Sequence, residues 1–351
     1  MKRSLVNTRP EEQRIMAFQI KRGTNISHWL SQSERRGEAR ENWFTRRDVE
    51  QIASWGFDHI RLPFDEVQLW TDDERREPEA WHLLESALDW AQTAGLNVVL
   101  DFHILRSHYF NQDGVPALFS ARDSLDRFLS MWVDLSKELQ SWSPDFLAYE
   151  ILNEAVAPSP DDWNRVSGEA FRLLRDREPD RTIVLGSNRF NSAATYDSLA
   201  IPDDRLCLLT FHHYNPMAVT HHQAPWTAVG GYQGPVRYPG PSVSGADLAA
   251  LDPTLRDAMK PFTRPYGRED ILAEMEPPLR RSRETGLPLY CGEFGVYHRT
   301  PIEARDNWYR DMISLFEEHD VAWANWDYKG HFGLIDSAGR ETGIRSLLLH
   351  P

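Results

Sequence analysis

Two short stretches of this sequence decide its fold: LAYEILNEA at residues 147–155 and LPLYCGEFG at residues 287–295. Each is a largely apolar run that leads into a glutamate, Glu154 in the first stretch and Glu293 in the second. Short apolar runs without polar alternation are typical of strands buried on both faces, as in a parallel sheet. Both stretches therefore predict a buried strand that carries an ionisable side chain at or near its carboxyl end.

Similar apolar runs recur along the chain and alternate with longer amphipathic segments. We expect strands at 22–27, 58–64, 97–103, 147–153, 182–187, 206–214, 287–293 and 321–328. Apolar residues at three- and four-residue spacing predict helices at 47–57, 78–95, 123–140, 160–176, 269–286 and 302–319.

Residues that favour helix ends support this alternation. Pro78 and Pro160 suit helix starts, and Gly56, Gly95 and Gly286 stand where helix C-caps belong. Alternating strands and helices over the whole length predict an α/β fold, a single-domain (β/α)8 TIM barrel over residues 1–351. A doubly wound open sheet is the alternative, but no glycine-rich phosphate-binding fingerprint follows the first strand.

One segment interrupts the rhythm. Residues from about 215 to 268 are rich in Pro, Gly, Tyr and Trp and show no periodicity. This connection leaves the carboxyl end of the sixth strand, where barrel active sites are built. We expect a loop that forms part of a substrate cleft, with an irregular loop that only covers the barrel as the alternative.

Composition limits the function classes. The 351 residues include 39 Lys and Arg against 53 Asp and Glu, for a formal net charge of −14, which would repel nucleic acid. A neutral partner such as a sugar tolerates that charge. Cys207 and Cys291 lie in apolar runs and are interpreted as reduced core thiols, with a bridge between neighbouring strands as the alternative.

Targeting signals are not visible. Residues 1–16 contain no apolar h-region, and no stretch approaches the roughly 18 uninterrupted apolar residues of a membrane span. We therefore expect a cytoplasmic protein with no membrane partner, or a secreted one if a leader has been removed.

Polar and ionisable residues gather near the carboxyl ends of the predicted strands. Such residues from several strands converge on one mouth in a barrel. They are Arg61, His103, Asn153, Glu154, His212, Tyr214, Glu293 and Trp326.

Taken in order, these residues resemble the motif set of glycoside hydrolase family 5. The motifs are HIRLPF, VVLDFH, the Asn-Glu pair 153–154, FHHYNP, GEFG and NWDYKG, and the resemblance covers roughly residues 20 to 345. It implies a retaining β-glycoside hydrolase that acts on an oligo- or polysaccharide and needs no cofactor or metal. Retaining hydrolysis uses two carboxyl groups about 5–5.5 Å apart.

The resemblance also implies roles for individual residues. Glu154 is the expected acid/base and Glu293 the expected nucleophile. Arg61 is expected to hydrogen-bond Glu293 and keep it ionised. Asn153 is expected to bond the sugar 2-hydroxyl, a contact that strengthens in the transition state.

Histidine and tyrosine side chains complete the expected subsite. His103 and His212 would line it as neutral imidazoles, and Tyr214 would donate to Glu293 or near the ring oxygen. His212 is preferred over His213 because it has the H-x-Y spacing, and strand alternation would point His213 away.

A metal is the other use for clustered histidines, but their spacing fits no compact ligand motif. These histidines are His103, His108, His212, His213, His221 and His222.

Tryptophans are the expected sugar platforms. Trp326 is expected to stack under the sugar, with Trp226 and then Trp29 as further candidates. Trp81, Trp90 and Trp132 lie on helical stripes and are assigned to the core.

Substrate choice stays open at this stage. The segment THHQAPW at residues 220–226 is similar to a loop of endo-acting members that cleave β-1,4-glucan and sometimes mannan. An endo-β-1,4-glucanase is preferred. The alternatives are a β-mannanase or β-mannosidase, an exo-acting β-glucosidase on short oligosaccharides, a non-catalytic carbohydrate-binding pseudoenzyme and a metal-dependent barrel hydrolase.

Overall fold

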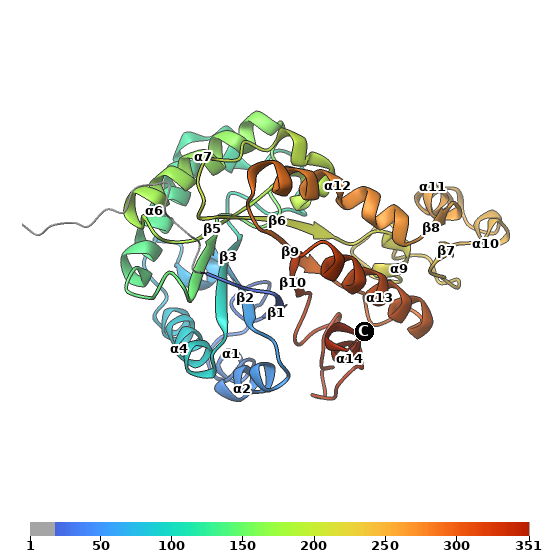
Figure 1. Ribbon diagram of the computed structural model, residues 1–351, viewed down its shortest axis with the longest axis horizontal. Coiled ribbons are helices and arrows are strands. Elements are labelled where there is room, and N and C mark those ends of the chain that lie inside the picture. The colour runs from blue at the N-terminus through green and yellow to red at the C-terminus, as the bar shows by residue number, and fades with distance from the viewer. Residues whose placement is uncertain (1–17, 351) are drawn as a thin grey trace, which may run out of the picture.

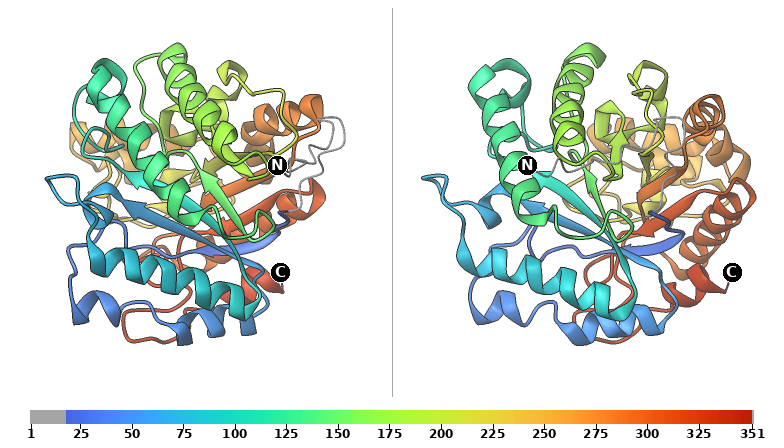
Figure 2. Two further views of the ribbon diagram at one scale, coloured as in Figure 1. Left: turned by 90° about the vertical axis from the view of Figure 1, so that its left-hand side faces the viewer. Right: turned by 60° about the vertical axis from the view of Figure 1, so that its left-hand side comes forward.

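Eight parallel strands close into a barrel in the computed structural model, which describes residues 18–350 (Figures 1 and 2). Around the barrel the strands follow the order β1-β10-β9-β6-β5-β4-β3-β2, and each neighbouring pair is parallel. The predicted (β/α)8 barrel is confirmed, and the closed ring excludes the doubly wound open sheet. The barrel strands are β1 (Arg22–Asn25), β2 (His59–Asp65), β3 (Asn97–Ile104), β4 (Leu147–Glu150), β5 (Ile183–Gly186), β6 (Cys207–His213), β9 (Leu289–Phe294) and β10 (Ala322–Asn325).

Most barrel strands are rich in apolar residues because both of their faces are covered. Side chains alternate between the barrel interior and the surrounding helices. Val98 packs in the large outer cluster, whereas Val99 packs in a small inner one. In the strand register, Arg61 lies beside Val99 and Val99 beside Ala148, so the three share one level inside the barrel. Val99 and Ala148 pack in the inner apolar cluster at this level, and the acids Asp101 and Glu150 follow two residues later on the same strands.

Helices surround the strands on the outside (Figure 1). Pro78 opens α4, and Gly95 and Gly286 end their helices with left-handed φ angles of 76° and 69°, as the sequence indicated. The helices on the barrel are α1 (Glu38–Glu41), α2 (Arg46–Ser54), α3 (Glu66–Leu69), α4 (Pro78–Ala94), α5 (Ala117–Ser120), α6 (Arg122–Leu139), α7 (Pro160–Arg177), α12 (Arg268–Thr285), α13 (Ile302–Glu318) and α14 (Ile344–Leu349).

After β5 the long helix of the regular pattern is replaced by two short elements. They are α8 (Asn188–Asn191) and the 3-10 helix η2 (Ala193–Ser198), which packs against α12. The chain thus passes from β5 to β6 without a long helix, and α8 forms a turn directly after β5.

The segment at 215–268 is more ordered than its sequence indicated. It is built from α9 (Met217–Thr220), β7 (Gly240–Pro241), α10 (Gly245–Ala249), α11 (Pro253–Met259), the 3-10 helix η3 (Lys260–Thr263) and β8 (Pro265–Tyr266). Val229, Tyr232, Val236, Val243 and Met259 give it a small apolar cluster of its own. Its α10, α11, β7 and β8 project from the barrel (Figure 1). Local packing, which periodicity does not reveal, orders this segment.

Both cysteines are buried and free, which confirms the prediction of reduced core thiols. Within residues 18–350, no helix has the length and apolar character needed to cross a bilayer. The segment 1–16, on which the leader prediction depends, lies outside the described residues.

Candidate active site

A cleft with a volume of about 1300 Å³ opens at the carboxyl ends of the barrel strands. Loops after different strands supply its walls, among them His28 after β1, Phe190 after β5 and Trp226 after β6. The cleft also contains Glu154 and Glu293. The strand-end residues identified in the sequence therefore converge on one site, as barrel geometry requires.

Glu293 lies near the end of β9, and its side chain is almost completely buried. The two glycines of the GEFG motif leave room for neighbouring atoms that a Cβ atom would clash with. A Cβ on Gly295 would lie 2.3 Å from the Trp326 carbonyl oxygen, and a Cβ on Gly292 would lie 2.9 Å from the Thr210 hydroxyl. The glycines of this motif are therefore needed because backbone and side-chain atoms approach the chain closely on both sides of Glu293.

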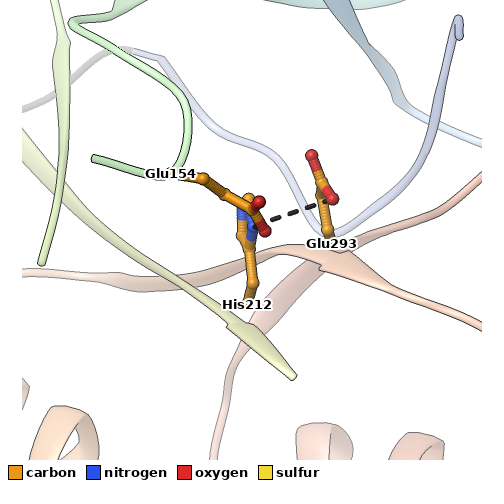
Figure 3. Close-up of side chains that lie close together, drawn as sticks. All are labelled: Glu154, His212 and Glu293. Carbon is orange, nitrogen blue, oxygen red and sulfur yellow. Dashed lines mark hydrogen bonds and ion pairs between the residues drawn. The ribbon is translucent and has the colours of Figure 1, made fainter. Parts of the chain in front are cut away.

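Glu154 lies in the loop after β4, because the strand ends at Glu150 and not at Asn153 as predicted. Its backbone has a φ of 41°, in the left-handed region that non-glycine residues rarely adopt. This conformation presents its carboxyl group to His212, whose Nδ1 lies 2.8 Å from Glu154 Oε1. Figure 3 shows the Glu154, His212 and Glu293 side chains meeting from a loop and two strands.

The two carboxyl groups are close neighbours. One oxygen of Glu154, one of Glu293 and a ring nitrogen of His212 all lie within 4.8 Å of one another. Retaining glycosidases hold their carboxyl groups about 5–5.5 Å apart, whereas inverting enzymes need about 6.5–9.5 Å to admit a water molecule. The separation matches the retaining arrangement.

Arg61 is fully buried beneath the pair and binds several groups at once. Its Nη1 donates to Glu293 Oε1 at 2.7 Å, and its Nη2 donates to Asn153 Oδ1 at 2.9 Å. Its Nε and Nη2 form a bidentate pair with Glu150 at 2.7 and 3.0 Å, and Nη2 lies 3.0 Å from Asp101 Oδ2. One guanidinium therefore orients the carboxylate at the barrel mouth and the acids below it.

The two glutamates have different electrostatic surroundings. Burial, and then the charge of Glu293, raise the pKa of Glu154 well above its ordinary value. Burial also raises the pKa of Glu293, but Arg61 and the hydrogen bond from the Tyr214 hydroxyl at 3.0 Å oppose this rise. A proton shared by the pair is consequently held on Glu154, and Glu293 is the ionised partner.

Both histidines of the subsite are neutral. Burial lowers the pKa of His103 to about 3 and holds the pKa of His212 well below its ordinary value. His103 Nδ1 is hydrogen-bonded to Asp101 at 2.7 Å, and its ring is parallel to that of Trp326 at 5.6 Å. The Nε2 atoms of both histidines have no partner within residues 18–350, which leaves them available to a ligand. His213 packs on Trp308, although it also touches the cleft wall.

The candidate tryptophans separate into two groups. Trp326 and Trp226 line the cleft, and Trp226 is 53% exposed. Trp29 is completely buried, its indole N–H donates to the Arg40 carbonyl, and it packs on Phe44. The prediction of a sugar contact at Trp29 is therefore corrected: this indole belongs to the core.

A cation is the competing interpretation of the cluster formed by Glu154, His212 and Glu293, because each residue offers one ligand atom. The Arg61 guanidinium, 2.7 Å from Glu293, places a positive charge where a metal ion would be repelled. The arrangement suits a pair of carboxyl groups that share a proton better than a metal centre.

Sequence reasoning missed the layer below the pair. Arg61 contacts Asp101, Glu150 and Asn25, and none of these three was singled out from the sequence. A signal was present, because an acid inside an apolar strand must find a positive partner when buried. Asp101 stands two residues before His103, and Glu150 lies in the middle of LAYEIL.

Comparison with known proteins shows the family to which this chain belongs. The family model described as cellulase (glycosyl hydrolase family 5) matches residues 23–332. The chain is 31% identical over 314 residues to endoglucanase C of Acetivibrio thermocellus, covering 88% of this chain and 91% of that protein. It is 26% identical to cellodextrinase A of Ruminococcus flavefaciens, covering 86% of this chain and 84% of that protein.

Solved structures share the fold at lower identity. Subunit Z of the cellulose synthase of Clostridioides difficile has a TM-score of 0.76 at 21% identity, covering 95% of this chain and 100% of that one. Cel5A of Thermotoga maritima, in a complex with mannotriose, has a TM-score of 0.73 at 22% identity, covering 97% and 99%.

Replacing Glu293 by Gln should lower the pKa of Glu154, because the neighbouring negative charge is removed while burial is unchanged. Titration of the Glu154 carboxyl carbon by NMR measures this shift. Glu274→Gln is the matched control, since Glu274 also lines the cleft but bonds Tyr266 and Asn215 instead of Glu154. An unchanged Glu154 pKa in Glu293→Gln would refute the coupling of the two carboxyl groups.

Proposed function

The chain is a glycosidase of glycosyl hydrolase family 5, and we propose that it is a retaining endo-β-1,4-glucanase with Glu293 as nucleophile and Glu154 as acid/base. The observation that carries this proposal is the pair itself. One oxygen of each carboxyl group lies within 4.8 Å of the other, and the surroundings favour a proton on Glu154 and a negative charge on Glu293.

In the first step Glu293 Oε2 or Oε1 attacks the anomeric carbon while Glu154 gives its proton to the departing glycosidic oxygen. The bond from carbon to the leaving sugar breaks, and a glycosyl ester of Glu293 forms. Arg61 stabilises the carboxylate before attack and remains hydrogen-bonded beside the ester.

In the second step the charges of the pair have reversed. Glu293 is now a neutral ester, so the repulsion that raised the pKa of Glu154 is gone. Glu154 as a carboxylate removes a proton from water, the water oxygen attacks the anomeric carbon, and Glu293 leaves. Glu154 is again protonated, and the two displacements together retain the β configuration.

Side chains around the pair fit a sugar in the covalent subsite. The Asn153 side-chain N–H groups have no partner within the described residues, while its oxygen is fixed by Arg61 at 2.9 Å. This amide is therefore oriented to donate to a sugar hydroxyl. Trp326 presents an indole in the cleft, the kind of surface on which the C–H face of a pyranose stacks.

Size and similarity support the choice of a polymeric glucan. The cleft volume of about 1300 Å³ exceeds the roughly 300–1,000 Å³ of a common small-molecule pocket. The relative with 31% identity is named as an endoglucanase. The volume favours a polymer over a short oligosaccharide, and the name of the relative favours glucan over mannan.

An exo-acting or short-chain β-glucosidase is the second candidate. One relative, matched over 86% of this chain, is named as a cellodextrinase. Such an enzyme would use the same pair but accept only short oligosaccharides.

Replacement of each carboxyl group separates the two roles. Glu154→Ala should reduce kcat/KM for phenyl β-cellobioside by about 10²–10⁴-fold, because its leaving group needs a proton. The 2,4-dinitrophenyl analogue should change far less, since its leaving group departs as the anion. Glu293→Ala should reduce both by several orders of magnitude. Equal losses on both substrates in Glu154→Ala would contradict the acid/base role.

Product analysis decides the substrate. Soluble β-1,4-glucan should lose viscosity rapidly and release mixed oligosaccharides, whereas β-mannan should react more slowly. Glu293→Gln under the same conditions controls for contaminating glucanase. Monosaccharide release from short substrates without viscosity loss would replace the endo assignment by the exo one, and faster action on mannan would replace glucan.

A further inference from the structure

The turn after β5 has an unusual backbone. Arg189, Phe190 and Asn191 have φ angles of 55°, 63° and 54°, so three consecutive non-glycine residues are left-handed. The left-handed conformation is sterically unfavourable for each of these residues. Strain of this kind persists only where surrounding contacts hold it, and it is often found at functional sites.

The contacts that hold this turn lead to the loop that carries Glu154. Asn188 Oδ1 accepts from the Ala157 N–H at 2.8 Å, and Asn188 Nδ2 donates to the Ala157 carbonyl at 3.1 Å. The Phe190 N–H donates to the Ala155 carbonyl at 3.2 Å. The Asn188 side chain is 4% exposed and thus makes both bonds away from competing water.

The loop of Glu154 has few other anchors. The Asn153 N–H donates to the Phe102 carbonyl at 2.9 Å, and the Val156 N–H donates to His108 Nε2 at 3.2 Å. Between them Glu154 has a φ of 41°, a conformation that its own side chain does not favour. Ala155 and Ala157, the first and third residues after Glu154, are thus both hydrogen-bonded to the β5 turn.

We propose that Asn188 is a positioning residue for the acid/base: its side-chain amide clamps the backbone of Ala157 and holds Glu154 beside Glu293, where Glu154 can give its proton to the glycosidic oxygen. This inference rests on the proposed function of Glu154. Asn188 does not line the cleft, so it acts through the loop and not by touching substrate.

A displaced acid/base has a characteristic kinetic effect. Proton donation to the leaving group weakens, while attack by Glu293 is unaffected. The rate of hydrolysis should therefore fall for substrates with poor leaving groups and stay nearly unchanged for substrates with good leaving groups. General destabilisation of the barrel would slow both equally.

The test compares Asn188→Ala with the wild type on phenyl and 2,4-dinitrophenyl β-cellobioside. We expect kcat/KM to fall about 10–100-fold for the phenyl substrate and less than about 3-fold for the dinitrophenyl substrate. Asn188→Asp keeps the acceptor for the Ala157 N–H and loses the donor, so it should show a smaller split and serves if the alanine variant does not fold.

Asn164→Ala is the matched control. Asn164 also bridges backbone groups, donating to the Ser198 carbonyl at 2.8 Å and accepting from the Ala200 N–H at 2.9 Å. Like Asn188 it does not line the cleft, but its partners lie outside the loop that carries Glu154. The control should leave the ratio of the two rates unchanged.

A second readout does not depend on activity. The NMR signal of the Glu154 carboxyl group is identified as the one missing from Glu154→Gln. In Asn188→Ala the pKa of this group should fall toward that of an ordinary glutamate, because Glu154 lies farther from Glu293 and is less buried. Equal rate losses on both substrates, or an unchanged Glu154 titration, would overturn the positioning role. Absence of β-cellobioside hydrolysis by the wild type would instead refute the proposed function, and the titration would still decide the role of Asn188.

Discussion

The site depends on one buried guanidinium. Arg61 contacts Glu293, Glu150, Asp101 and Asn153 at 2.7 to 3.0 Å while excluded from water. A single positive charge among three carboxylates does not neutralise them all. Burial accordingly raises the pKa of Asp101 to about 7 and that of Glu150 to about 6. Removing one partner from such a buried pair typically costs about 3–5 kcal/mol, so the contacts that orient the proposed nucleophile also stabilise the fold.

The position of Arg61 also creates the asymmetry that the chemistry uses. It donates directly to Glu293, whereas within residues 18–350 the Glu154 carboxyl group has only the neutral His212, at 2.8 Å, as its hydrogen-bond partner. Two chemically identical side chains thereby acquire opposite protonation states. Glu293 is held in strand β9, whereas Glu154 lies in a loop and has a left-handed backbone conformation. The barrel supplies rigidity, and the loops after β4 and β5 supply the alignment.

Much of this was predictable from sequence because it follows from periodicity and strand ends. Apolar runs marked the barrel strands, and Gly95 and Gly286 marked helix ends. Glu154, Glu293 and Trp326 were found because each stands near the carboxyl end of a strand. Trp29 was misassigned because a tryptophan just after the first strand is compatible with a sugar platform and with core packing. Its hydrogen bond to the Arg40 carbonyl and its complete burial show that it belongs to the core.

Other features depend on contacts between distant segments, which no local pattern encodes. The order in residues 215–268 comes from a small apolar cluster, and the clamp of Asn188 on Ala157 joins residues 31 positions apart. The left-handed conformations of Glu154 and of Arg189 to Asn191 likewise have no sequence signature, because glycine is absent from these positions. Tertiary hydrogen bonds impose these conformations.

The central claim is that Glu154 and Glu293 form a retaining pair. The most direct measurement is the anomeric configuration of the first sugar that the wild-type enzyme releases from a β-linked oligosaccharide, followed by proton NMR before mutarotation. A retaining pair should release the β anomer first. Initial release of the α anomer would contradict it, because single displacement needs room for water between carboxyl groups about 6.5–9.5 Å apart.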